Sequence, residues 1–234
     1  VNVTLSLRQP GSSMKPFAYL AAFEKGYTPN TILYDVATTF KTDTKDYQPL
    51  NYDLTERGPV SIRTALQGSL NIPAVKTIYL VGVQKLIDML ELFGYTSFED
   101  RSRFGLSLVL GGGEVRLIEH TAAYGTLANK GVYNPPVGIL KVEDSKGNVL
   151  LEYEEKDRKV MKPDYINVLN SILSDDAARA YVFGAGGYLT LPDRSVAAKT
   201  GTTNDYRDAW TMGYTPNLVT GVWVGNNDNS EMKR

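Results

Sequence analysis

The strongest constraint on the fold is that strand patterns occupy both ends of the chain and helical patterns occupy its middle. Residues 1–7, VNVTLSL, alternate apolar and polar side chains, and the last 40 residues contain the segments SVAAKTG, AWTMGY and LVTGVWVG. Turn residues 215–217, TPN, join the last two segments and indicate an antiparallel connection. We therefore expect an α+β protein in which N- and C-terminal segments form an antiparallel sheet flanked by helices.

The middle of the chain repeats apolar residues at helical spacing. Residues 12–25 show this spacing before Gly26, and the segments SIRTALQG, IPAVKTIYLVG and VQKLIDMLELF show it before Gly94. Further helices are expected in EVRLIEHTAAYGTLANKG and over residues 163–181. Two stretches lack this helical spacing. We expect a long surface excursion over residues 27–60. We expect a hairpin in which the turn DSKGN joins the segments VGILKVE and NVLLEYE.

Composition excludes several classes of function. Lysine and arginine total 25 against 26 acidic residues, and the net charge of −1 argues against a nucleic-acid partner. The chain has no cysteine, and His120 is its one histidine, so we predict no metal site and a structural role for His120. It contains no apolar run near the roughly 20 residues of a membrane helix, and it begins without methionine or a signal-peptide pattern. We expect a piece cut from a longer protein.

A serine and a lysine stand one helical turn apart directly after the turn Pro10-Gly11. At this spacing the Lys15 amine can reach the Ser12 hydroxyl, and a desolvated lysine can take the proton of a serine nucleophile. Ser13 stands only two residues from Lys15 and is not an equal candidate. The alternative is that Ser12 and Ser13 only cap a helix.

Two further segments carry side chains suited to catalysis or substrate binding. Ser69-Leu70-Asn71 lies in a break between helices, where a hydroxyl and a carboxamide can project into a cleft. Lys199-Thr200-Gly201-Thr202 ends a strand and combines a cation, hydroxyls and a glycine, which suits carboxylate binding. The structural alternatives are a capping serine and an edge-strand lysine.

Taken together, these groups resemble the Ser-x-x-Lys, Ser-x-Asn and Lys-Thr-Gly motifs of penicillin-binding proteins and serine β-lactamases. Longer segments resemble the transpeptidase domain of class A, bifunctional penicillin-binding proteins, and they span nearly the whole chain: RQPGSSMKPFAYLAA, SLNIPAVK, LVLGGGEV and KTGTTNDYRDAWTMGYTP. The resemblance implies one transpeptidase domain over residues 1–234, truncated at both ends.

The resemblance also implies a role for each matching residue. Ser12 would be the acylated nucleophile and Lys15 its base, while Ser69 would relay protons beside the positive charge of Lys199. Substrate contacts would come from Asn71, Thr200, Gly201 and Thr202, and the oxyanion hole from the backbone N–H groups of Ser12 and Thr202. The middle motif reads Ser-Leu-Asn where many β-lactamases have Ser-Asp-Asn, but it keeps the hydroxyl and the carboxamide.

The implied activity is that of a DD-transpeptidase, which cross-links peptidoglycan stem peptides through a serine acyl-enzyme and is acylated by β-lactams. It needs no metal or organic cofactor. The parent protein would carry an upstream glycosyltransferase domain and a membrane anchor, at the extracytoplasmic face of a bacterial membrane. Alternatives are a DD-carboxypeptidase, a serine β-lactamase and a non-catalytic β-lactam sensor. Against a β-lactamase, no Glu-x-x-x-Asn pattern occurs, and Tyr124-Gly125 is followed by Thr126 where class D enzymes have asparagine.

Overall fold

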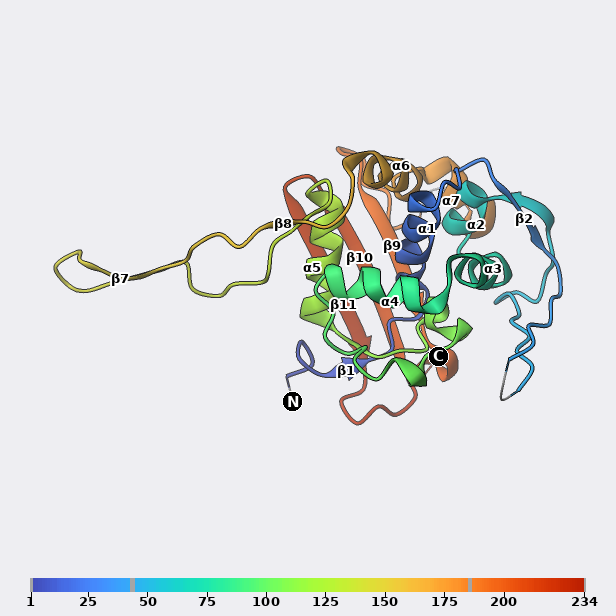
Figure 1. Ribbon diagram of the computed structural model, residues 1–234, viewed down its shortest axis with the longest axis horizontal. Helices are drawn as coiled ribbons and strands as arrows, with labels where there is room; N and C mark the ends of the chain where they lie inside the picture. Colours follow the sequence, from blue (N-terminus) through green and yellow to red (C-terminus); the bar gives the residue numbers. More distant parts are fainter. Residues whose placement is uncertain (1, 43–44, 185–186, 234) are drawn as a thin grey trace.

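An antiparallel sheet built from the C-terminal part of the chain lies behind the helices in the view of Figure 1. The computed structural model describes residues 2–42, 45–184 and 187–233. The sheet has the order β11-β10-β9, with β9 at Ala197–Thr202, β10 at Asp208–Thr215 and β11 at Leu218–Gly225. Alternate residues of β10 are buried, as expected for a sheet with one face against the core. The α+β class and the antiparallel C-terminal strands are thereby confirmed.

The prediction that the N-terminal segment joins this sheet is wrong. Strand β1 is only Leu7–Arg8, the residues before it form a turn, and it pairs with β4 (Val115–Arg116). An alternating sequence pattern does not specify which strand a segment pairs with. Strand β4 provides only two residues for pairing, because a helix begins directly after it. The N-terminal segment still contacts the sheet, because the Trp210 indole donates a hydrogen bond of 2.8 Å to the carbonyl of Gln9.

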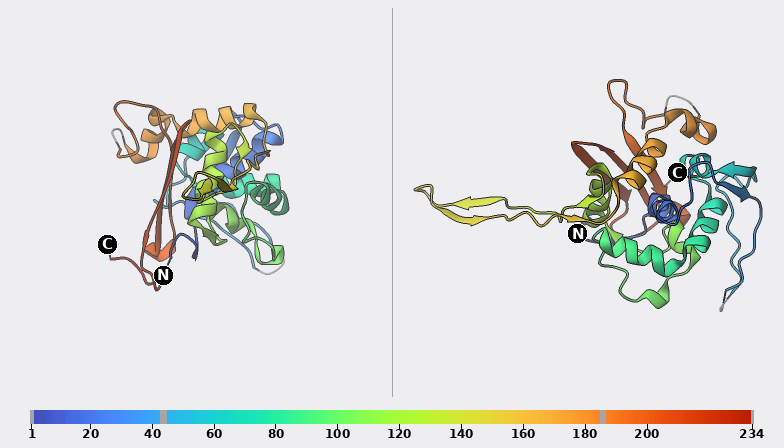
Figure 2. Two further views of the ribbon diagram at one scale, coloured as in Figure 1. Left: turned by 90° about the vertical axis from the view of Figure 1, so that its left-hand side faces the viewer. Right: turned by 45° about the horizontal axis from the view of Figure 1, so that its top comes forward.

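Most of the described helices lie on one face of the sheet (Figure 2, left). Helices α5 (Leu117–Ala128) and α6 (Pro163–Leu173) contact the strands, while α1 (Lys15–Glu24) is enclosed by other helices, and all its residues from Lys15 to Phe23 are buried. The remaining α-helices are α2 (Ile62–Gln67), α3 (Asn71–Val81), α4 (Val83–Leu92) and α7 (Asp176–Phe183). Short 3₁₀ helices are η1 (Gly11–Met14), η2 (Arg101–Arg103), η3 (Leu106–Leu110) and η4 (Asn204–Tyr206).

Residues 27–60 are only partly a surface excursion. They contain β2 (Ile32–Asp35) and β3 (Gly58–Ser61), which pair with each other. The side chains of Asp35 and Asn51 within this region are buried, with 0% and 3% exposed surface. The excursion therefore sends polar groups into the interior, where Asp35 bonds Asn51 and Asn51 contacts the start of α3.

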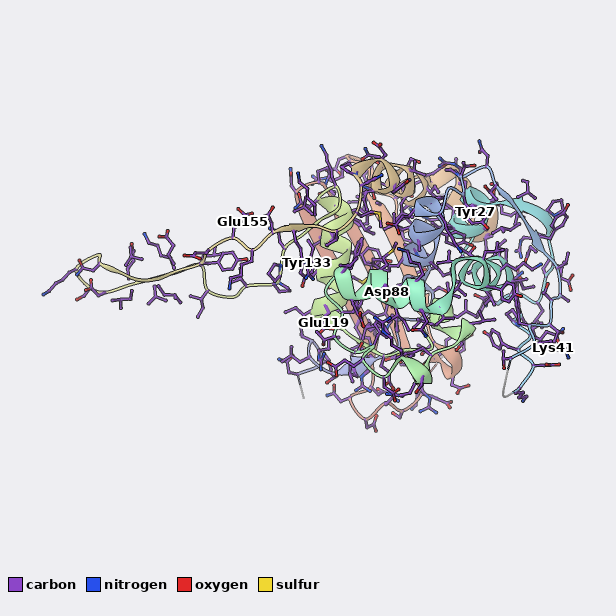
Figure 3. All side chains as sticks on the ribbon, viewed as in Figure 1. Tyr27, Lys41, Asp88, Glu119, Tyr133 and Glu155 are labelled. Atoms are coloured by element: carbon purple, nitrogen blue, oxygen red, sulfur yellow. The ribbon has the colours of Figure 1, made fainter. Side chains whose placement is uncertain are left out.

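A long arm leaves the body between β5 (Val132–Tyr133) and β8 (Arg158–Lys159), which pair at its base. The arm, residues 134–157, contains the predicted hairpin of β6 (Lys141–Glu143) and β7 (Val149–Glu152). Figure 3 shows Tyr133 at the base and Glu155 on the arm, with side chains pointing outward along its length. None of the helices in the described ranges is long and apolar enough to cross a membrane.

Candidate active site

The turn that carries Ser12 is held tightly, yet the Ser12 side chain is only half-buried. Ser13 is buried: its hydroxyl donates to the Pro10 carbonyl at 2.7 Å and lies 2.8 Å from His120 Nε2. Because the Ser13 proton is used on Pro10, Nε2 must carry a proton, and Nδ1 accepts from the Tyr95 hydroxyl at 2.7 Å. Burial lowers the pKa of His120 to about 3, so the ring stays neutral.

Three glycines allow the turn that carries Ser12 to pack closely against neighbouring segments of the chain. Gly11 has φ +57°, and a Cβ there would lie 2.7 Å from the backbone oxygen of Thr202. A Cβ on Gly201 would lie 2.1 Å from the Pro10 oxygen, and one on Gly111 would lie 2.2 Å from the Gly11 nitrogen. The backbone next to Ser12 is thus packed between strand β9 and the turn after η3, which places it beside the backbone of Thr202.

The Lys15 amine points at the break between α2 and α3. Its Nζ donates to the backbone oxygen of Ser69 at 2.6 Å, to Asn71 Oδ1 at 2.7 Å and to Ser69 Oγ at 3.3 Å. Ser69 has φ +53°, an uncommon backbone conformation for a residue with a side chain, and it turns its hydroxyl toward the amine. The expected hydrogen bond from Ser12 to Lys15 does not occur among the contacts of the described residues.

Lys199 approaches the same hydroxyl from the sheet. Its Nζ donates to Ser69 Oγ at 2.8 Å and to the Thr200 carbonyl at 2.9 Å. The Ser69 hydroxyl therefore lies between two lysine amines, one from α1 and one from β9.

Both amines are buried, with 0% of Lys15 and 4% of Lys199 exposed. Burial, and secondarily the charge of Lys199, lowers the pKa of Lys15 well below its usual value. Burial, and secondarily the Arg179 guanidinium, lowers the pKa of Lys199 to about 7. Two adjacent buried amines do not both hold a proton easily, so one of them can serve as a base near neutral pH.

The structure brings the predicted residues together. Lys15, Ser69, Asn71 and Lys199 form one hydrogen-bonded cluster, and Gly201 packs on the turn that carries Ser12. Thr200 is half-buried and Thr202 exposed on the same strand. Metal-binding clusters of three or more His, Cys, Asp or Glu side chains are not found in the described part of the chain.

Three residues that contribute to the site were not predicted from the sequence. Asn51 and Gly111 reach the site from distant segments, and Arg179 of α7 lowers the pKa of Lys199. The glycine run 111–113 is a visible signal, but at the level of the sequence a tight turn is enough to explain it. No local pattern marks Asn51 or Arg179, because their effects depend on contacts across the fold.

Comparisons with known proteins agree with this geometry. The family model described as penicillin binding protein transpeptidase domain matches residues 3–233. Penicillin-binding protein 1A of Aquifex aeolicus is 37% identical over 94% of this chain, and penicillin-binding protein 2D of Bacillus subtilis is 34% identical over 97%. The chain spans only 30% and 33% of these two relatives.

Solved structures show the same architecture. PonA1 of Mycobacterium tuberculosis in complex with penicillin V superposes with a TM-score of 0.85 at 28% identity, over 99% of this chain and 64% of that one. Penicillin-binding protein 1A of Haemophilus influenzae gives 0.82 at 27% identity, over 97% and 39%. The predicted resemblance to class A penicillin-binding proteins is confirmed. The chain belongs to the penicillin-binding protein transpeptidase domain family.

Proposed function

We propose that this domain is a peptidoglycan DD-transpeptidase that works through an acyl-enzyme at Ser12. The observation that carries the proposal is one hydrogen-bonded cluster: the amines of Lys15 and Lys199 both reach the Ser69 hydroxyl, and the Lys15 amine also bonds Asn71 Oδ1. This arrangement supplies a base and a proton relay for the proposed nucleophile, Ser12.

In the proposed reaction, Ser12 Oγ attacks the penultimate D-alanine carbonyl and its proton passes to neutral Lys15. The backbone N–H groups of Ser12 and Thr202 stabilise the oxyanion. The peptide bond breaks, and D-alanine leaves with a proton relayed through Ser69. An amine of a neighbouring stem peptide then attacks the ester and frees Ser12.

Asn71 would hold the substrate amide, and Thr200, Gly201 and Thr202 would receive its terminal carboxylate. A bound carboxylate favours the charged form of Lys199, whose pKa is lowered to about 7 by burial and by Arg179. Substrate binding therefore recharges Lys199, and this charge favours the neutral form of Lys15 that the first step requires.

The alternatives differ in the fate of the acyl-enzyme. A β-lactamase needs a base that holds a hydrolytic water, and the chain lacks the glutamate pattern that class A enzymes use. A carboxypeptidase would transfer the acyl group to water, and a sensor would not turn over. We further propose that the parent protein carries a glycosyltransferase domain and a membrane anchor and acts at the extracytoplasmic face of a bacterial membrane.

Incubation with a penicillin tests the proposal. We expect one covalent adduct per chain, mapped to Ser12, that persists for many minutes after free drug is removed. Ser12→Ala should remain unlabelled, while Ser13→Ala provides a neighbouring control. Intact-mass spectrometry follows the adduct over time. A label at Ser13 or Ser69 would disprove the nucleophile, and rapid return to the unmodified mass would indicate a β-lactamase.

A further inference from the structure

Asn51 is a buried amide whose hydrogen-bonding groups are all used. Its Nδ2 donates to both carboxylate oxygens of Asp35, at 2.8 and 2.9 Å, and to the Thr55 carbonyl at 2.8 Å. Its Oδ1 accepts from the backbone N–H groups of Asn71 at 2.8 Å and Ile72 at 3.3 Å. The side chain thus links the 27–60 region to the start of α3.

This contact replaces a helix cap that α3 lacks. The residue at the N-cap position is Leu70, whose side chain makes no capping hydrogen bond. A helix normally needs a side-chain oxygen there to satisfy its first N–H groups. Asn51 supplies that oxygen from a segment twenty residues earlier in the chain.

The neighbouring residue fixes the orientation of the Asn71 side chain. Asn71 Nδ2 donates to the Leu50 carbonyl at 2.8 Å, so Asn71 Oδ1 faces the Lys15 amine at 2.7 Å. If the amide were reversed, it would place a donor against the amine. The position of residues 50 and 51 therefore decides which atom Lys15 meets.

Asp35 holds Asn51 in turn. The Asp35 carboxylate is fully buried and also accepts from the Arg57 backbone N–H at 3.2 Å. Because a buried carboxylate needs its donors, the amide of Asn51 is strongly constrained in both position and rotation.

We propose that Asn51, held by Asp35, is a positioning residue for acylation, which sets the place of Asn71 and so the direction of the Lys15 amine. This inference rests on the proposed function, in which Lys15 is the base and Asn71 contacts substrate. Asn51 itself touches neither the nucleophile nor the lysine in the described contacts.

The test separates binding from the chemical step. In Asn51→Ala we expect the first-order acylation rate constant k2 for penicillin to fall roughly 10- to 100-fold, because a displaced base loses alignment. The dissociation constant of the non-covalent complex should rise by a smaller factor than k2 falls, because Asn71 would hold the substrate amide, and one label per chain should still be reached. Merely structural damage would lower the labelled fraction instead of k2.

Two controls make the result specific. Asn170→Ala removes another amide, which bonds the Leu127 carbonyl and the Tyr214 hydroxyl away from the cluster, and it should keep the parental k2. The exchange Asp35→Asn with Asn51→Asp keeps an acceptor for α3 and a 35–51 hydrogen bond but loses the donor to the Thr55 carbonyl, so it should raise k2 only part of the way from the Asn51→Ala value. If Asn51→Ala shows no cooperative melting, Asn51→Ser takes its place.

Parental k2 in a folded Asn51 variant, or an equal loss in Asn170→Ala, would overturn the inference. Failure of the proposed function is distinct, since the parental protein would then not be labelled at Ser12 at all.

Discussion

At the scale of single residues, the burial of two lysine amines destabilises the folded state, and the same burial favours the neutral amine that the proposed reaction requires. Lys15 and Lys199 lose nearly all their hydration, and the hydrogen bonds to Ser69, Asn71 and Thr200 replace it only in part. The same burial lowers the pKa of each amine and makes a neutral base available. Stability and reactivity therefore conflict at these two positions.

Lys199→Met should stabilise the protein most strongly at pH 7 and below. The pKa of Lys199 falls from 10.5 to about 7 on folding, so between these values the unfolded chain binds more protons. Parental stability should thus rise with pH across this window, on the order of a few kcal/mol in total. Thermal melting at pH 6, 8 and 10 measures this, and the advantage of Lys199→Met should shrink as pH rises. An advantage independent of pH would show that Lys199 keeps its usual pKa.

At the scale of elements, close backbone contacts at Gly11 and Gly201 set the distance from the Ser12 turn to strand β9. Gly11, Gly111 and Gly201 come from three separate segments and allow approaches that any side chain would block. The site is therefore assembled by packing of main chain on main chain, and the order of the motifs along the sequence does not encode that packing.

Gly111→Ala should damage both stability and acylation. Its φ of +85° disfavours a side chain, and the new Cβ would lie 2.2 Å from the Gly11 nitrogen, a backbone atom that cannot move alone. We expect a loss of about 2 kcal/mol or more in the free energy of unfolding, together with slower penicillin acylation. Gly105→Ala is the matched control, because nothing lies within 4 Å of its Cβ. Equal unfolding curves and rates for the two variants would contradict the packing argument.

At the scale of the whole molecule, the arm contains none of the candidate active-site residues. No residue from 135 to 156 is buried, although the arm exposes several large apolar side chains, including Leu140, Leu150 and Leu151. A two-stranded hairpin of this kind adds little to the stability of the body. The arm is therefore a separable feature of the fold (Figure 1).

Replacing residues 135–156 by Asn-Gly should leave the domain intact. Tyr133 pairs with Arg158, so residues 134 and 157 lie opposite each other, and a two-residue turn can join them. We expect a change within about 1 kcal/mol, or ~2–4 °C in Tm, and an unchanged acylation rate. Calorimetry and penicillin labelling check both quantities. A large loss of Tm would mean that the arm supports the core.

The local elements and the identity of the chemical groups can be predicted from short stretches of sequence. Helices such as α3 and α4 follow from apolar spacing within about ten residues, their ends from Gly82 and Gly94, and β9 to β11 from alternation and turn residues. Ser12, Lys15, Ser69, Asn71 and Lys199 are recognisable because each motif is complete within a few positions. Such signals depend on residues close together in the sequence, so they can be recognised without knowledge of the fold.

How these elements and side chains contact one another follows from the folded structure alone. It paired β1 with β4, turned Lys15 toward Ser69 and Asn71, and placed the Ser69 hydroxyl between two amines. It also brought Asn51 to the start of α3 and Arg179 near Lys199. Strand partners, burial and pKa shifts arise from contacts between residues far apart in the chain, and no local pattern records those contacts.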